Sequence, residues 1–340
     1  MILVTGGAGY IGSVLVPTLL GRGHSVRVVD RLLFGDRGLA TLGSAVDLIV
    51  ADIRSLDPRV YEGVDTIVHL AGLSNDPMAE FNPAANHAIN AAATQTLARA
   101  AKAAGVGRFL YASSCSVYDL GLEAEDVLRD ERAAVSPRAA YAVSKYDGER
   151  AALELASPGF VVSVLRKGTV YGYSPRMRYD LVVNTFVKDA FTRGVLTVFA
   201  GGEMWRPLVD VADVAAAYAG LVEAPADAIN GEIFNLVYKN YRVLELAHAV
   251  REALRPHLDV AIDVRYEPVP VRSYRVAGRK LEDRLHFRPT VSVKDSVTEM
   301  VKRIQVEGMT DFMNPRYDNI AWLKLLVAAE DSLKRLGPVL

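Results

Sequence analysis

Cysteine is almost absent from this sequence, which has one, Cys115, among 340 residues. A single thiol excludes an internal disulfide framework and suits a reducing compartment. Long apolar runs are lacking too, because no stretch reaches the ~18 residues that suggest a membrane span. The start, MILVTGG, has neither the basic residues nor the long apolar segment of a secretory signal. We therefore expect a cytoplasmic protein without a membrane partner.

A strong charge of either sign is also missing. The 39 basic and 40 acidic side chains leave a net charge of −1. This balance gives no reason to expect a nucleic acid or an anionic membrane as a partner. We expect no metal site. What the chain does have is length and 51% hydrophobic residues, enough for one large or two coupled domains with a sizeable core.

Short β-branched runs alternate with helical patterns through the first half of the chain. Apolar residues are nearly continuous in these runs, as in parallel strands that are covered on both faces. The alternation predicts an α/β fold with a doubly wound parallel sheet of the Rossmann type. The expected strands are 2–5, 25–30, 46–53, 65–72, 108–114 and 160–165, and the expected helices are 10–21, 84–104 and 139–156.

The pattern loosens after about residue 172. A polar loop, YGYSPRMRYD, precedes a predicted helix at 181–193, and a strand at 232–237 returns to the first domain. The remainder predicts a helix at 243–254, a strand around 260–267, and helices near 293–305 and 318–335. We therefore expect a sheet domain at 1–172, with return segments at about 208–240. A smaller interleaved α/β lobe with a helical tail would take residues 173–207 and 241–340.

Glycines cluster in TGGAGYIG, residues 5–12, between the first strand and the first helix. Gly7, Gly9 and Gly12 fit G-x-G-x-x-G, while Gly6, Gly9 and Gly12 fit the related G-x-x-G-x-x-G spacing. Glycine permits the tight turn and the close approach of a phosphate, and the helix N-terminus offers N–H groups and a positive dipole end. Asp30 ends the second strand, 18 residues after Gly12. Together these features predict a dinucleotide site.

Asp30 also indicates which dinucleotide is bound. A carboxylate at this place accepts hydrogen bonds from the adenosine ribose and repels the 2′-phosphate of NADP, which favours NAD. Arg31 complicates the prediction, because a basic neighbour softens that repulsion. A turn residue without a ligand is the alternative interpretation of Asp30.

YAVSK places Tyr141 and Lys145 four residues apart, on one face of a predicted helix. A phenol has a pKa near 10, and lowering it by about three units requires roughly 4 kcal/mol. A lysine one turn away and an oxidised nicotinamide nearby would supply that preference. Ser114 ends the fifth strand, where ligands of open α/β sheets bind, and its hydroxyl would orient a substrate oxygen. The alternative is an ordinary pair on a helix surface.

These motifs together resemble one family. TGGAGYIG, VVD, ADI, HLAGL, YASS…VY and YAVSK look like the extended short-chain dehydrogenase/reductase family, and more narrowly like NAD-dependent epimerases and dehydratases of nucleotide sugars. UDP-galactose 4-epimerase is their best-known member. The motifs run in the family's order from residue 2 to about 215, with weaker matches to about 300. They are specific for the family and much less so for the substrate.

The resemblance implies which residues bind the cofactor NAD. The expected contacts are Gly6, Gly9, Tyr10, Ile11 and Gly12 at the pyrophosphate, Asp30 at the ribose, Asp52 and Ile53 at the adenine, Leu70, Ala71 and Gly72 beside the cofactor with Asn90 below it, Ser113 supporting it, and Lys145 at the nicotinamide ribose. Ser114, Tyr141 and Lys145 form the implied catalytic set.

The resemblance also implies a nucleotide-diphosphate sugar as substrate. Ser114 and Tyr141 would face the sugar. Arg206 in GGEMWRPLVDVADVA and Arg272 in PVRSYRV match the family's arginines for the diphosphate, and Asn184 matches its amide contact. A planar guanidinium suits phosphate because it donates two parallel hydrogen bonds. The alternative for both arginines is an ion pair with a nearby aspartate.

The positions after Ser114 bear on the type of reaction. In related 4,6-dehydratases they carry an Asp and a Glu, which eliminate water from the keto-sugar. This chain has Cys115 and Ser116 there. A serine hydroxyl is too weak an acid or base for elimination, and a thiol would need strong activation. We therefore interpret Cys115 as a packing residue and expect no dehydration.

The sequence thus predicts an NAD-dependent nucleotide-sugar epimerase that oxidises the sugar transiently and returns the hydride. The rivals are a 4-ketoreductase, a 4,6-dehydratase, and a non-catalytic dinucleotide-binding sensor, the last weakened by the intact Ser–Tyr–Lys set. Departures such as Thr169, where the family often has an amide, put the sugar in doubt. Family resemblance suggests a homodimer through helices near 84–104 and 139–156. The tail at 308–340 carries no evident catalytic motif.

Overall fold

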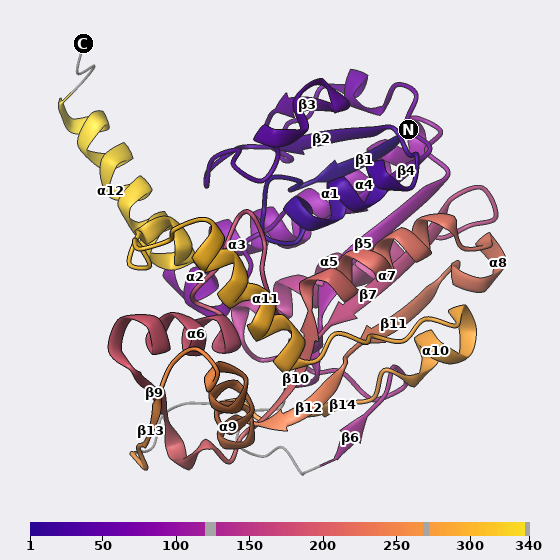
Figure 1. The fold of residues 1–340 in the computed structure, drawn as a ribbon. Helices are drawn as coiled ribbons and strands as arrows, with labels where there is room; N and C mark the ends of the chain where they lie inside the picture. Colours follow the sequence, from indigo (N-terminus) through magenta and orange to yellow (C-terminus); the bar gives the residue numbers. More distant parts are fainter. Residues whose placement is uncertain (120–126, 268–271, 337–340) are drawn as a thin grey trace.

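A seven-stranded parallel sheet forms the centre of the protein (Figure 1). The computed structural model describes residues 1–119, 127–267 and 272–336. The strand order is β11-β7-β5-β4-β1-β2-β3. Successive strands are added on one side of β1 up to β3 and on its other side from β4 on, and this switch places a crevice at the carboxyl ends of β1 and β4. The doubly wound sheet predicted from sequence is confirmed. Its strands are β1 (Ile2–Thr5), β2 (Val26–Asp30), β3 (Val46–Val50), β4 (Thr66–His69), β5 (Arg108–Ser114), β7 (Val161–Lys167) and β11 (Glu232–Leu236).

Helices cover both faces of this sheet. Alternate residues of a strand point to opposite sides, so Val4 packs in one cluster with Leu15 of α1 (Gly12–Gly21), and Leu3 packs in the other with Leu97 of α4 (Ala93–Ala103). The α7 helix (Val211–Glu223) lies beside α1, and α5 (Ala140–Leu153) beside α4. Burial on both faces accounts for the nearly continuous apolar strands.

The predicted single helix at 84–104 is interrupted. It consists of α3 (Pro83–His87), a π-helical turn at Ala88–Ala92, and α4. Such turns insert an extra residue and often mark functional sites. Strands β3 and β4 also end earlier than the sequence predicted, because the residues after Val50 and His69 leave the sheet at its carboxyl edge. The homodimer expected through these helices stays a prediction.

Three small sheets lie outside the central sheet. They join β8 (Thr169–Tyr171) with β10 (Trp205–Asp210) and β12 (Lys239–Arg242), β9 (Val195–Val198) with β13 (Ala261–Val264), and β6 (Leu128–Arg129) with β14 (Arg275–Val276). The remaining α-helices are α2 (Asp76–Phe81), α6 (Val182–Arg193), α8 (Ala226–Ile229), α9 (Val243–Leu254), α10 (Arg279–Leu285), α11 (Val293–Val306) and α12 (Asn319–Leu336). The predicted helices at 181–193, 243–254, 293–305 and 318–335 match α6, α9, α11 and α12, whereas α2 and β8 were not predicted.

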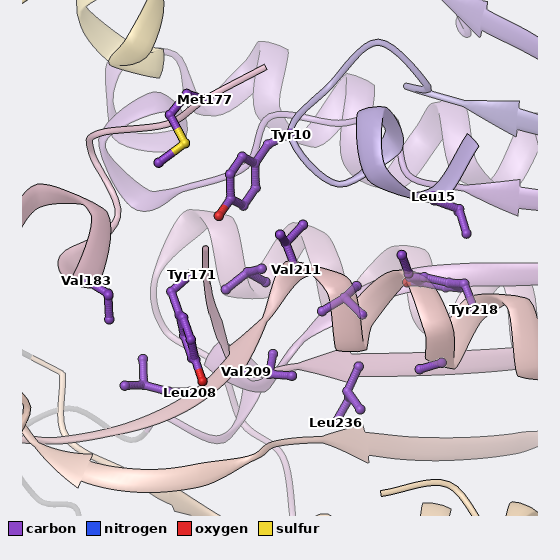
Figure 2. Packing of buried hydrophobic residues seen from close by; sticks show 14 of the residues in the cluster. Tyr10, Leu15, Tyr171, Met177, Val183, Leu208, Val209, Val211, Tyr218 and Leu236 are labelled. Carbon is purple, nitrogen blue, oxygen red and sulfur yellow. The ribbon is translucent and has the colours of Figure 1, made fainter. Parts of the chain in front are cut away.

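The two lobes share one core (Figure 2). Tyr10, from the glycine loop, donates a hydrogen bond to Gly172 O at 2.6 Å, just after β8. Tyr171 of β8 and Val209 of β10 belong to the same apolar cluster as Tyr10 and Leu15. The glycine loop is therefore fixed directly against the second lobe.

The α12 helix runs away from the body of the molecule (Figure 1). Asn319, at its first position, is its buried residue. In the described ranges, 1–119, 127–267 and 272–336, no helix is long and apolar enough to cross a membrane. The last four residues of the tail, 337–340, lie outside the described residues.

Asp210 offers a test of the packing between the lobes. Its carboxylate is buried at the start of α7, where it accepts Ala212 N at 2.7 Å. Burial raises its pKa from 3.8 to about 6. The folded chain therefore holds this proton more tightly than the unfolded chain does. The contribution of Asp210 to stability is full below about pH 4 and falls as the pH rises to about 6.

Asp210→Asn should remove this pH dependence, because an amide does not titrate. Its oxygen can still accept the bond from Ala212 N. We expect the variant to gain stability relative to the parent at pH 8 but not at pH 4, by on the order of 3 kcal/mol at most. Thermal unfolding at both pH values measures the effect. Asp227→Asn, an exposed residue of α8, serves as the control. An equal change at both pH values would contradict the assignment.

Candidate active site

A large cavity opens at the carboxyl edge of the central sheet. The loops that follow β1, β2, β4, β5 and β7 line it. The predicted site residues in its lining are Gly6, Gly9, Tyr10, Ile11, Gly12, Asp30, Asp52, Ile53, Leu70, Ala71, Gly72, Ser113, Ser114, Tyr141, Lys145 and Arg272. The structure therefore brings the expected catalytic residues and most expected cofactor contacts to one place.

The glycine loop forms a cradle without room for side chains. Gly6 has φ +72°, and a Cβ on it would lie 2.7 Å from Ala71 N. A Cβ on Gly12 would lie 2.5 Å from Gly6 O. Ile11 precedes α1 without a capping side chain, so the helix start faces the cavity with backbone donors. This backbone fits the pyrophosphate of a dinucleotide.

Asp30 is held in place by the backbone at the end of β2. Its two oxygens accept Ala8 N at 3.0 Å and Leu32 N at 2.8 Å. Burial raises the pKa of its carboxyl. Arg31 does not pair with Asp30, because its Nη1 lies 3.3 Å from Asp52 Oδ2. The carboxylate of Asp30 is thus fixed at the cavity, where the ribose of a dinucleotide would meet it.

Tyr141 and Ser114 meet at the end of the cavity nearest β5. Burial and the charge of Asp76 raise the pKa of Tyr141 to about 12, while Arg272, Arg178 and a hydrogen bond from Ser114 lower it. The surrounding protein alone therefore does not prepare the phenol as a base. A bound cation at the nicotinamide position would act in the required direction.

Lys145 lies beneath Tyr141 in the same helix. Its Nζ donates to Ala112 O at 3.1 Å and lies 5.3 Å from the centre of the Tyr111 ring. Burial lowers its pKa to about 8. Its activation of Tyr141 stays a prediction for the cofactor-bound state.

Three predicted residues lie outside the cavity lining. Asn90 is buried in the π-helical turn, where its amide bonds both Leu73 N and Leu73 O at 2.9 Å. This places it behind the wall that Gly72 forms. Asn184 is also buried, with its amide committed to Gly172 N at 3.0 Å and Arg178 O at 2.9 Å. As the cavity stands, Asn184 braces the loop after β8 rather than facing the ligand.

Arg206 is the third of these residues. It donates to the backbone oxygens of Trp205 and Arg272. Arg272 lines the cavity and pairs with Asp76 of α2, with Nη2 and Oδ2 2.7 Å apart. The two arginines therefore differ in position, since Arg206 holds the backbone of the arginine that reaches the cavity.

Sequence reasoning missed several cationic residues of the lining. Arg176 and Arg178 come from the loop that was predicted only as polar. Lys167 ends β7 and donates to Ser113 O at 2.7 Å. Burial and the charge of Lys145 lower the pKa of Lys167 to about 7. The two arginines in SPRMR were a usable signal, because the loop follows a strand that ends at the binding edge.

Cys115 faces away from the cavity. It is fully buried in a small cluster with Val117 and Tyr274, and its Sγ donates to Arg166 O at 3.2 Å. Burial raises the pKa of the thiol. Ser116 does line the cavity, and its backbone N donates to Ser114 Oγ at 3.2 Å. Cys115 therefore lies away from a ligand in the cavity, and Ser116 offers such a ligand only a hydroxyl.

The parallel sheet and the glycine cradle define a Rossmann-type dinucleotide-binding fold. The sequence model of the NAD dependent epimerase/dehydratase family matches residues 2–236, and the chain belongs to this family of NAD-dependent nucleotide-sugar enzymes. NAD is accordingly its cofactor.

Relatives in the family carry out different reactions. UDP-glucuronic acid decarboxylase 1 of Arabidopsis thaliana is 30% identical over 311 residues, with 88% of this chain and 68% of the relative covered. UDP-glucose 4-epimerase of Thermotoga maritima has a similar structure, with a TM-score of 0.78, 25% identity, and coverage of 91% and 99% of the two chains. The dTDP-glucose 4,6-dehydratase DesIV of Streptomyces venezuelae, solved with NAD, gives a TM-score of 0.76, 27% identity, and coverage of 90% and 97%. The family is thus established, and the reaction is left open.

The orientation of Arg31 leads to a prediction about cofactor choice. Because Arg31 is directed to Asp52, it does not pair with Asp30 to offset the repulsion of a 2′-phosphate. We expect calorimetric titration of nucleotide-free protein to give at least about tenfold tighter binding of NAD than of NADP. Asp30→Asn should reduce this ratio, and Asp52→Asn should reduce it less, because it removes the partner that directs Arg31 away from Asp30. Equal or tighter binding of NADP by the parent protein would show that Asp30 does not select the cofactor.

Proposed function

We propose that the protein is an epimerase of a nucleotide-diphosphate sugar. The observation that carries this proposal is the composition of one cavity. Ser114, Tyr141 and Lys145 line it together with the glycine cradle, while Cys115 lies outside its lining. The cavity thus has the groups for reversible oxidation of an alcohol, and the two positions after Ser114 supply no carboxylate pair to divert the ketone.

The chemistry assigned to the side chains is proton transfer at one sugar hydroxyl. Tyr141 Oη would take the hydroxyl proton and later return it, and Ser114 would share a hydrogen bond with the same sugar oxygen. Lys145 would favour the phenolate through its charge. Bound NAD supplies a reversible hydride acceptor, which lets an alcohol become a ketone and be reduced again from the other face.

Dehydration requires more than these three residues. One group must remove a C5 proton and another must protonate the departing hydroxyl. Cys115 is buried with a raised pKa, and the Ser116 hydroxyl is too weak an acid or base for either step. The arrangement therefore supports epimerisation over elimination.

The diphosphate of the substrate is assigned to Arg272. Its Nη1 is buried without a hydrogen-bond partner in the described part of the chain, and Asp76 orients the rest of its guanidinium. Arg206 would act through Arg272 as a positioning residue. The Asn184 amide bonds Gly172 N and Arg178 O, so its contact with the diphosphate stays a prediction.

Tyr141→Phe tests the catalytic assignment. We expect turnover to fall by about 10²–10⁴-fold, the usual contribution of a general acid–base group, with NAD content unchanged. Tyr146→Phe, on the same helix but outside the cavity lining, serves as the matched control. Activity is measured by product analysis with UDP-glucose, UDP-glucuronic acid and dTDP-glucose. Near-parental turnover in Tyr141→Phe would refute the role.

The products decide between reactions. The proposal predicts a stereoisomer of unchanged mass from at least one of these sugars. An 18-dalton loss would identify a dehydratase, and release of carbon dioxide from UDP-glucuronic acid would identify a decarboxylase. Either outcome would overturn the epimerase proposal while leaving the family assignment intact.

Substitution of the arginines tests the substrate site. Arg272→Gln should raise KM for the nucleotide sugar and weaken UDP inhibition by about 10-fold or more, since a charge-assisted hydrogen bond contributes ~1.5–3 kcal/mol. Arg206→Gln should also raise KM and weaken UDP inhibition, but by less than Arg272→Gln does. Arg206→Lys should lose less UDP inhibition than Arg206→Gln. Arg279→Gln, on the exposed face of α10, is the control. Unchanged UDP inhibition in Arg272→Gln would place the diphosphate elsewhere.

A further inference from the structure

Arg176 is a buried cation at the cavity wall. The residue is 6% exposed, and its Nε and Nη1 have no hydrogen-bond partner in the described part of the chain. Its guanidinium lies 3.9 Å from the centre of the Phe34 ring, and its Nη2 donates to Asn319 Oδ1 at 2.6 Å. Burial and the charge of Arg178 lower its pKa to about 9. Two unused donors on a buried guanidinium are unfavourable unless an anion meets them.

The surroundings indicate which anion fits. Ser174 donates to Tyr10 O at 2.7 Å, and Tyr10 donates to Gly172 O at 2.6 Å, so this segment is bonded to the glycine loop. Asp30 is near enough to influence Arg176 electrostatically, but its oxygens accept backbone N–H groups instead. The free donors of Arg176 therefore belong to the part of the cavity that the glycine loop and Asp30 also line.

We propose that Arg176 donates from its two unpartnered nitrogens, Nε and Nη1, to the diphosphate of the bound dinucleotide, and that Asn319 positions it. A planar guanidinium matches a pair of phosphate oxygens. The diphosphate would then be held by the glycine cradle and by a cation from the second lobe. The C-terminal segment, which carries no catalytic motif, thereby gains a role in retaining the cofactor.

The first turn of α12 is built for this positioning. Asn319 Nδ2 donates to Ser74 Oγ at 2.8 Å, so one amide connects the loop after β4 with Arg176. Trp322 Nε1 donates to Leu33 O at 2.5 Å, next to the Phe34 ring on which Arg176 lies. The helix start therefore holds two loops of the cavity wall in place around the guanidinium.

Binding of cofactor fragments tests the proposal without any turnover. Full-length protein freed of nucleotide is titrated with adenosine, ADP, ADP-ribose and NAD. Arg176→Gln should weaken the three diphosphate ligands by about 10- to 100-fold, while adenosine changes less than about twofold. Arg176→Lys and Asn319→Ala should give smaller losses for the same three ligands. Arg37→Gln is the control. Arg37 pairs with Glu307 and donates to Tyr317 of the C-terminal segment, but it does not line the cavity.

If Arg176→Gln lost equal affinity for adenosine and ADP-ribose, or lost affinity for neither, the proposal would be overturned. A loss confined to UDP binding by NAD-loaded protein would assign the arginine to the substrate's diphosphate instead, and would also overturn it. Should Arg176→Gln fail to fold, the Lys and Asn319→Ala variants carry the same comparison. Because no reaction is measured, these results are independent of whether the enzyme is an epimerase.

Discussion

The active-site face depends on one buried ion pair, between Glu149 of α5 and Arg166 of β7. Both side chains are almost completely buried, with Arg166 Nε 3.0 Å from Glu149 Oε2 and Nη1 donating to Tyr118 at 2.7 Å. Glu149 lies one helical turn after Lys145, so the pair fixes the helix that carries Tyr141 to the strand beside it. Removing one partner of such a pair costs ~3–5 kcal/mol, because the other charge is left buried. The reacting groups are thus placed by groups that do not contact the substrate.

A close approach at Gly148 completes this placement. A Cβ there would lie 2.5 Å from Tyr111 Oη and 2.7 Å from Asn90 O, so only glycine lets α5 settle on the sheet and on the π-helical turn. The same turn carries the Asn90 amide, which holds the backbone of Leu73 at the cavity wall. Helix, turn and wall consequently form one connected unit around Lys145. A distortion of any of them would shift the lysine relative to the cavity.

The sheet was predicted correctly and most of the expected cofactor contacts line one cavity, because both depend on local signals. Apolar runs mark strands, and the glycine loop and Asp30 lie within one βαβ unit. The substrate half was harder, since its side chains are fixed by distant partners. Asn184 and Arg206 match family positions, yet their hydrogen bonds to Gly172 and to the backbone at Arg272 emerge only from the fold. Arg176 was missed for the same reason, because its partner Asn319 is 143 residues away.

That separation has a consequence for how the protein matures. The glycine loop is synthesised first, whereas β11, at one edge of the central sheet, ends at residue 236, and the wall around Arg176 includes Asn319. A chain still emerging from the ribosome can form the nucleotide-binding edge of β1 and β2 long before the cavity is complete. The finished wall exists only once residue 319 has been synthesised, so the proposed contact of Arg176 with the cofactor would form late in synthesis.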